Sequence, residues 1–243
     1  MRIGIIGVGH IGSTLARELS RRGHDVAVAN SRGPETIEKH VLAHGARAVT
    51  AHDAVEVLIL SVPLSVIPGL APLIAGVPES TTIIDTSNYY PMRDGDDLLP
   101  SGQAESEWVV EQLGRPVAKA WNTIGSQSLE RKGAAAGAPG RIALPVAADR
   151  PQDRDRAMGL VDETGFDPYD AGELAQSWRQ QPGNPCYGTD LTLEELPAAL
   201  AAADAERAPR RRDLTVAIFA ERMGSGVNPD ADWGVAVSRL VYG

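Results

Sequence analysis

The chain has 243 residues, of which 43% are hydrophobic and 23% charged, as expected for a soluble globular protein with one large domain or one domain and a small addition. Its formal net charge of -9 argues against nonspecific binding to nucleic acids or anionic membranes. The single cysteine excludes an internal disulfide, and no apolar run approaches the roughly 20 residues of a membrane helix. The first strand is expected to begin at the second residue. We therefore expect a cytoplasmic protein without a membrane partner.

The first 33 residues have the pattern of a dinucleotide-binding unit. The apolar run 2–6 predicts a buried strand, Gly7–Gly12 has the spacing GxGxxG, and a helical pattern follows. In this order Gly7 permits a tight turn, Gly9 lets the backbone approach a pyrophosphate, and Gly12 lets the helix pack closely on the strand. The N-terminus of that helix offers free N–H groups to the phosphates.

Residues 25–29 predict the second strand, and the residues after it indicate which dinucleotide is bound. Asn30 stands where an NAD enzyme would carry a carboxylate for the ribose diol, and Ser31 and Arg32 follow. A hydroxyl and a guanidinium suit a 2′-phosphate, which an acid at position 30 would repel. We therefore expect NADP(H) rather than NAD(H).

Strand-like and helical stretches alternate up to about residue 170, which predicts an α/β fold with a doubly wound, mostly parallel (Rossmann) sheet over residues 1–172. Further strands are expected at 47–50, 57–61, 82–86, 117–121, 141–146 and 166–170, and helices at 34–44, 64–74, 104–113, 126–131 and 152–164. Such sheets bind ligands at the carboxyl ends of their strands. His40 and His44 would share one face of the helix 34–44, but no cysteine or third close ligand supports them, so no metal site is expected.

Residues 173–243 have a different pattern and are expected to form a loop and a short helical C-terminal extension. Helical patterns at 193–207 and 211–223 precede a Gly/Asn/Pro break at 224–229 and a short final segment. The extension is too short for a stable core of its own, so it should cap the sheet domain or contact a second subunit. A homodimer is expected, in which the partner covers the stripes Leu193, Leu196, Leu200 and Leu214, Val216, Ile218, Phe219.

Several motifs together resemble the bacterial and archaeal reductases related to NADPH:coenzyme F-420 oxidoreductase, whose coenzyme is a deazaflavin. These motifs are Gly7–Gly12, Gly23-His24, Asn30-Ser31-Arg32, Ser61-Val62-Pro63, residues 120–124 (AWNTI) and residues 170–174 (DAGEL). The resemblance covers about residues 1–174 and implies an oxidoreductase that transfers hydride between NADP(H) and a ring acceptor such as coenzyme F-420 or a flavin.

In that family the turn after the first strand holds the pyrophosphate, the Ser-Arg pair holds the 2′-phosphate, and the Val-Pro turn lies along the nicotinamide. Motif and resemblance together imply an NADP(H) site formed by Gly7, Val8, Gly9, His10, Ile11, Gly12, Asn30, Ser31, Arg32, Ser61, Val62, Pro63, Asn122 and Thr123. The acceptor, a small molecule, is expected against Ile124, Gly172, Leu174, Trp178, Arg179 and Tyr187. The loop from Trp178 to Gly188 is unlike the short ending of the deazaflavin enzymes, and we expect it to determine which acceptor is used.

Hydride transfer to a deazaflavin needs alignment of two rings more than acid–base help, whereas a small ketone or imine would need a placed proton donor. The candidate donors are Tyr89, Tyr90, Lys119, Asp170 and Tyr187. A non-catalytic NADP(H)-sensing protein is a third alternative. The strand-end segments 88–93, 122–126 and 171–174 favour an enzyme, because a sensor needs only the first two turns.

Overall fold

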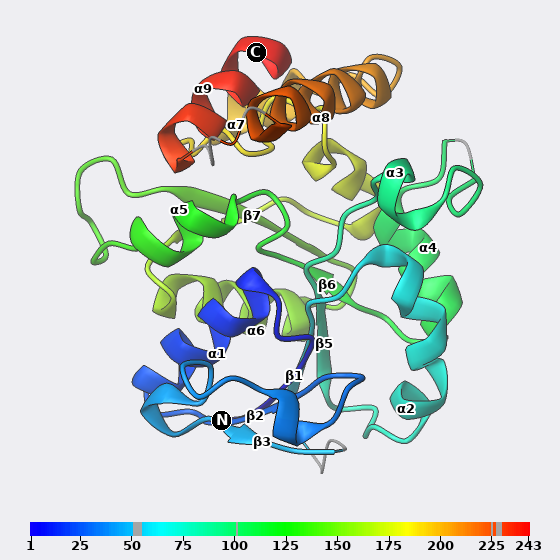
Figure 1. The fold of residues 1–243 in the computed structure, drawn as a ribbon, viewed down its shortest axis with the longest axis vertical. Helices are drawn as coiled ribbons and strands as arrows, with labels where there is room; N and C mark the ends of the chain where they lie inside the picture. The colour runs from blue at the N-terminus through cyan, green and yellow to red at the C-terminus, as the bar shows by residue number, and fades with distance from the viewer. Residues whose placement is uncertain (51–54, 101, 225, 227–229) are drawn as a thin grey trace.

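A computed structural model describes residues 1–50, 55–100, 102–224, 226 and 230–243, and these residues form an α/β fold around one mostly parallel sheet (Figure 1). The sheet has the strand order β3-β2-β1-β4-β5-β6-β7-β8, and its neighbouring strands are parallel except for β6 and β7. The predicted fold class is therefore confirmed. The strands are β1 (Arg2–Ile6), β2 (Asp25–Ala29), β3 (Arg47–Ala48), β4 (Val57–Leu60), β5 (Thr82–Asp85), β6 (Ala118–Lys119), β7 (Ala143–Ala148) and β8 (Asp167–Asp170).

Helices cover both faces of the sheet (Figure 1). The α-helices are α1 (His10–Arg21), α2 (Ala71–Ala75), α3 (Pro91–Asp94), α4 (Glu105–Leu113), α5 (Ser126–Arg131), α6 (Pro151–Glu163), α7 (Leu196–Ala201), α8 (Ala208–Gly224) and α9 (Ala231–Tyr242). Successive β1 residues alternate between two cores: Ile5 packs with α1 and α6, whereas Ile6 packs with α2 and α4. This alternation follows from the period of two along a strand and explains why β1 is apolar throughout.

The chain reverses its direction across the sheet between β1 and β4, which is where such folds bind ligands. Gly7 N–H donates to the Ala29 carbonyl at 2.9 Å, and Ser61 N–H donates to the Ile6 carbonyl at 2.8 Å. The turns that follow β1 and β4 therefore leave the sheet side by side.

Two of the predicted helices are wrong in form. Residues 34–44 contain the 3₁₀ turn η1 (Pro34–Thr36) and the start of a second one, η2 (Ala43–Gly45), because Ile37 is extended with a ψ of 121° and His44 has a positive φ of 64°, angles that an α-helix does not allow. Residues 64–74 divide into a 3₁₀ helix, η3 (Leu64–Leu70), and α2, because Pro68 has no N–H to donate to a preceding turn.

The C-terminal extension is more helical than expected, and its helices begin elsewhere. The predicted helix 193–207 is only α7, because the Asp204 carboxylate accepts hydrogen bonds from the N–H groups of Glu206 and Arg207 ahead of α8. The final segment is the 12-residue helix α9, whose N-terminus is capped by Asp230. The predicted break at 224–229 lies mostly outside the described residues.

The extension packs on the sheet domain of its own chain. Leu196 and Leu200 are buried with Ala143 of β7 and with Cys186, so these two residues of the predicted stripe are covered within the chain, whereas Leu193 is 47% exposed. A 3₁₀ helix, η4 (Leu174–Gln180), follows β8, and α8 and α9 lie together beyond α5 and β7 (Figure 1). Among the described helices, none combines the length and the hydropathy that a membrane crossing requires.

Candidate functional site

The turn between β1 and α1 is closed on its protein side and open on the other. A Cβ atom on Gly7 would lie 2.2 Å from the Ser61 carbonyl oxygen, and one on Gly12 would lie 2.1 Å from the Gly7 carbonyl oxygen. A Cβ atom on Gly9 would meet nothing within 4 Å. Gly9 is also the N-cap of α1, and no side chain caps this end of the helix. The first N–H groups of α1 therefore face open space, as an anion-binding turn requires.

A polar groove of about 630 Å³ begins at this turn, and its lining includes Gly9, Arg17, Arg32, His40 and Arg131. Arg17 is paired with Glu130 at 2.9 Å. The exposed Arg32 guanidinium, by contrast, makes neither an ion pair nor a hydrogen bond with the part of the chain that the structure describes. This cation is thus available to an anionic ligand in the groove.

Asn30 shapes the turn that carries Arg32. Its Oδ1 accepts a hydrogen bond from the Arg32 N–H at 3.0 Å, and its Nδ2 donates to Thr36 Oγ1 at 3.0 Å. Ser31 is exposed and does not line the groove. Of the predicted 2′-phosphate residues, the structure therefore brings Arg32 to the groove, while the Asn30 side chain stabilises the turn through its hydrogen bonds to Arg32 and Thr36.

A second cavity of about 350 Å³, here called the junction cavity, continues from the groove and shares Gly9, His10 and Ser126 with it. It lies at the carboxyl ends of β1, β4, β5 and β6, and the predicted residues that line it are Gly9, His10, Ile11, Ser61, Val62, Pro63, Asn122, Ile124 and Tyr187. Residues from several separate predicted segments therefore meet in one place.

Asn122 has an unused acceptor in the junction cavity. Its side chain is buried, and Nδ2 donates to Asn88 Oδ1 at 3.2 Å and to the Gln180 carbonyl at 2.9 Å, whereas Oδ1 has no partner among the described residues. The preceding Trp121 has a φ of 55° and is held by a hydrogen bond from Nε1 to Thr164 Oγ1 at 3.1 Å. A left-handed aromatic residue costs roughly 1–3 kcal/mol, and such strain is typical of functional sites.

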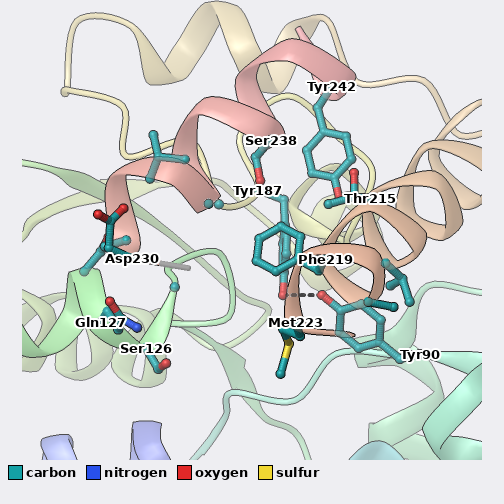
Figure 2. A pocket seen from close by; sticks show the side chains of 18 of the residues that line it. Tyr90, Ser126, Gln127, Tyr187, Thr215, Phe219, Met223, Asp230, Ser238 and Tyr242 are labelled. Carbon is teal, nitrogen blue, oxygen red and sulfur yellow. Dashed lines mark hydrogen bonds between the residues drawn. The ribbon is translucent and has the colours of Figure 1, made fainter. Parts of the chain in front are cut away.

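A third cavity of about 580 Å³, here called the apolar cavity, lies between the junction cavity and the helices α8 and α9 (Figure 2). It shares Tyr90, Arg93, Gly125, Ser126 and Tyr187 with the junction cavity. Side chains from α8 and α9 supply most of its apolar surface: Val216, Phe219, Ala220, Met223, Val235 and Tyr242. The three cavities therefore form one continuous path from Arg32 to α8.

Tyr90 and Tyr187 stand where the junction cavity meets the apolar cavity. Their hydroxyl oxygens are 2.9 Å apart, and Figure 2 shows the two phenols pointing toward each other. Burial raises the pKa of Tyr187 well above its ordinary value, and burial likewise raises the pKa of Tyr90, although the hydrogen bond that Tyr90 shares with Tyr187 lowers it. Both hydroxyls are therefore protonated at neutral pH and together hold two protons.

A buried polar cluster lies behind this pair. Lys119 Nζ donates to Asp85 Oδ2 at 2.7 Å and to the Ser87 carbonyl, and the Lys119 and Asp85 side chains are fully buried. Burial raises the pKa of Glu105 to about 7, and the positive charge of Lys119 limits that rise. Lys119 does not line any of the three cavities, so it serves the core rather than the site.

Other predicted site residues lie away from the path. The Tyr89 hydroxyl donates to the Gly95 and Asp96 carbonyls at 2.7 and 2.8 Å, and the Thr123 carbonyl accepts from the Gly188 N–H. Leu174 belongs to the core beside α4, and Gly172 forms a left-handed turn with a φ of 84°.

Trp178 and Arg179 contact each other instead of the apolar cavity. The Arg179 guanidinium carbon is 4.5 Å from the Trp178 ring centroid, and Arg179 Nη1 donates to the Leu200 carbonyl at 3.2 Å. Arg179 and Asp170 line a separate surface cavity. Of the expected acceptor residues, Ile124 and Tyr187 lie on the path from Arg32 to α8, and the other four do not.

Sequence reasoning missed the contributions of α5 and α8. Ser126 and Gln127 of α5 line both the polar groove and the apolar cavity. The segment ending at Ser126 was recognisable as one that follows a strand, but the position of α8 depends on how the extension folds back, which local patterns do not encode.

His40 pairs with Glu38 at 3.1 Å, and within the described residues no three His, Cys, Asp or Glu side chains are grouped to hold a metal.

Both the sequence and the structure are similar to known proteins. A family model described as NADP oxidoreductase, coenzyme F420-dependent, matches residues 2–89. The crystal structure of hypothetical protein SMa0349 from Sinorhizobium meliloti is 30% identical in sequence, and the match covers 79% of this chain and 95% of that chain with a TM-score of 0.67.

More distant similarities extend these findings. A structure described as an F420-dependent NADP reductase from Arthrobacter sp. FB24 is 18% identical, with 73% of this chain and 87% of that chain covered and a TM-score of 0.58. Its likeness shows the fold. The Escherichia coli K12 protein YjhV is 50% identical over 54 residues, which are 22% of this chain and 39% of YjhV.

Proposed function

The chain belongs to the family of the Sinorhizobium meliloti protein, and its residues 2–89 carry the N-terminal domain of the coenzyme F420-dependent NADP oxidoreductases; from this premise we propose that it is an NADP(H)-dependent enzyme that transfers hydride to or from an organic acceptor. The observation that carries the proposal is the continuous path of three cavities from Arg32, past the phosphate turn, to the tyrosine pair. A dinucleotide needs such a path, because its phosphates and its reactive ring lie at opposite ends.

The residues along this path fit NADP(H). The free N–H groups of α1 and the open side of Gly9 would accept the pyrophosphate, and Arg32 would bind the 2′-phosphate. The unpaired Asn122 Oδ1 would accept a hydrogen bond from the carboxamide of the nicotinamide. The bound cofactor would supply or accept the hydride, and these residues would hold it with its ring toward Tyr187.

The family match supports a deazaflavin such as coenzyme F420, or a flavin, as the first acceptor to test. A planar ring stacked on the nicotinamide needs alignment and exclusion of water more than an acid or a base. The apolar surface of α8 and α9 supports the binding of such a ring.

A small ketone or imine is the second candidate, because the tyrosine pair supplies the proton donor that its reduction requires. The decisive experiment is anaerobic oxidation of NADPH by the full chain with coenzyme F420, FMN, a quinone and small carbonyl compounds or imines, each supplied separately. Turnover with any of them supports the proposed enzyme. Tight binding of NADPH without turnover on any of them would instead identify a protein that senses NADP(H).

A further inference from the structure

The apolar cavity has the right place for a hydride acceptor. It opens into the junction cavity beside Tyr90 and Tyr187, and Ser126 lines both. Figure 2 shows the cavity between α5 on one side and the helices α8 and α9 on the other. A molecule held there would have one end at the tyrosine pair and the other against Phe219 and Met223 of α8.

The lining favours an uncharged ligand. Among the described residues that line the apolar cavity, only Arg93 and Asp230 are charged. Arg93 is already bound to Asp94 at 2.7 Å and to the Asn88 carbonyl at 2.6 Å, and the Asp230 carboxylate accepts from the Trp233 N–H at 2.8 Å. A ligand with several negative charges, such as the phosphate and carboxylate tail of a deazaflavin coenzyme, would find no free cation in this lining.

The tyrosine pair supplies one polar contact and one transferable proton. Two hydroxyls hold two protons, and the Tyr90–Tyr187 hydrogen bond uses one of them. The other proton is free to be donated to an acceptor atom of the ligand. The Arg93 guanidinium carbon lies 5.4 Å from the centroid of the Tyr90 ring and would stabilise negative charge that develops on the pair.

We propose that the apolar cavity binds an uncharged, apolar ketone or aldehyde and that the Tyr90–Tyr187 pair donates a proton to its carbonyl oxygen. The inference rests on the proposed NADP(H) function, which supplies the hydride. The carbonyl carbon accepts the hydride, the electron pair of the C=O π bond moves onto oxygen, and that oxygen takes the phenol proton. The phenolate regains a proton from solvent, so one ketone, one NADPH and one proton give one alcohol and one NADP⁺.

A protonated imine fits this site less well than a carbonyl compound. An iminium ion already carries its proton and needs an anion beside it, whereas a neutral phenol offers a proton to a neutral oxygen. The pair also selects the end of the ligand that enters first, because the opposite side of the cavity is lined by the apolar Val216, Phe219 and Met223 of α8.

The test uses the full chain with NADPH and three probes, cyclohexanone, acetophenone and 2-octanone, beside coenzyme F420 and FMN. We expect reduction of at least one ketone. Because either hydroxyl alone would still carry one free proton, the double variant Tyr90→Phe/Tyr187→Phe should lower kcat for that ketone roughly 100-fold, the size of a lost general acid, and change its solvent isotope effect and pH profile, while the Kd for NADPH stays within about twofold. Tyr169→Phe, a phenol on β8 outside the path, is the matched control and should leave all of these unchanged.

A second pair of variants tests the cavity without the tyrosines. Ala220→Trp on α8 should fill the apolar cavity and raise KM for the largest ketone at least tenfold with NADPH binding intact, whereas Leu193→Trp at an exposed position should do neither. Oxidation of NADPH with coenzyme F420 or FMN but with no ketone would overturn this inference and leave the proposed function standing. Failure to bind NADPH would overturn the proposed function itself.

Discussion

Arg32 is the residue on which cofactor choice depends, because its guanidinium lines the polar groove beside β2 and is not engaged by the rest of the described chain. Arg32→Ala should weaken NADPH binding by roughly 1.5–3 kcal/mol, the contribution of a hydrogen bond to a charged group, and leave NADH binding almost unchanged. Titration of both dinucleotides measures this. Arg47→Ala, which removes an exposed ion pair with Asp25, is the control. Equal losses for NADPH and NADH would contradict the 2′-phosphate assignment.

A substitution at Asn30 should shift cofactor preference in the opposite direction, toward NADH. Asn30→Asp keeps the oxygen that accepts from the Arg32 N–H and places a carboxylate where a ribose diol would bind, so the ratio of NADH to NADPH affinity should rise. The variant loses the hydrogen bond from Nδ2 to Thr36, and Thr36→Val provides the control for that loss. An unchanged cofactor ratio would argue against the position of the ribose at β2.

Glu105 should make stability depend on pH. Burial raises its pKa from 4.5 to about 7. The groups that face this carboxyl are Lys119 of β6, Asp85 of β5 and Arg212 of α8, and it accepts a hydrogen bond from the Tyr89 N–H. The folded state therefore keeps a proton that the unfolded chain loses, so the stabilisation is complete below about pH 4.5 and is lost as the pH rises to about 7.

The size of this effect is about 3 kcal/mol, from 1.4 kcal/mol per pKa unit. Chemical denaturation between pH 4.5 and 8 should show this decline in the wild-type chain and not in Glu105→Gln. Glu107→Gln, an exposed position on the same helix, should behave as the wild type does. A slope that survives in Glu105→Gln would assign it to other groups.

At the scale of elements, local sequence patterns predicted those strands, turns and helices that depend only on residues near them in the chain. The strand–glycine–helix order of residues 2–21 predicted both the turn and the edge of the sheet where a ligand binds. This was possible because an apolar run, a GxGxxG spacing and a 3.6-residue period can each be recognised within one short segment. The composition of residues 34–44 allows a helix, yet the extended backbone at Ile37 and the positive φ of His44 interrupt it. The apolar cavity lay beyond prediction, because it arises only when α8 folds back beside Tyr187.

The capping residue of α9 tests whether that helix forms the cavity. Asp230→Ala removes the carboxylate that accepts from the Trp233 N–H at 2.8 Å, which should cost about 1 kcal/mol of helix stability. Because Tyr242 and Val235 of α9 line the apolar cavity, KM for the acceptor should rise while the Kd for NADPH does not. Asp213→Ala on α8, outside the cavity lining, is the control. A parallel loss of NADPH binding would show that α9 supports the whole site.

At the scale of the molecule, the helices α8 and α9 lie at one end of the fold and bury few of their own residues (Figure 1). Leu214 and Met223 of α8 are 53% and 59% exposed, and Leu240 of α9 is 83% exposed. A second copy of the chain is the partner we propose for this surface, in keeping with the homodimer expected from the sequence. Such a dimer would remove these apolar side chains from water and shield the apolar cavity from the outside.

Light scattering over the micromolar range should therefore give a mass of two chains. In a twofold dimer each interface residue occurs twice, and burial of one exposed Leu contributes about 2 kcal/mol, so Leu240→Glu should weaken the dimer at least tenfold. Val66→Glu is the matched control, because Val66 is also exposed but lies on η3 in the sheet domain. The loss of the dimer should raise KM for the acceptor and spare NADPH binding, since Arg32 and the phosphate turn lie at the opposite end of the path. A monomeric wild-type chain at every concentration would refute the dimer, and the apolar cavity would then be closed by α8 and α9 of a single chain.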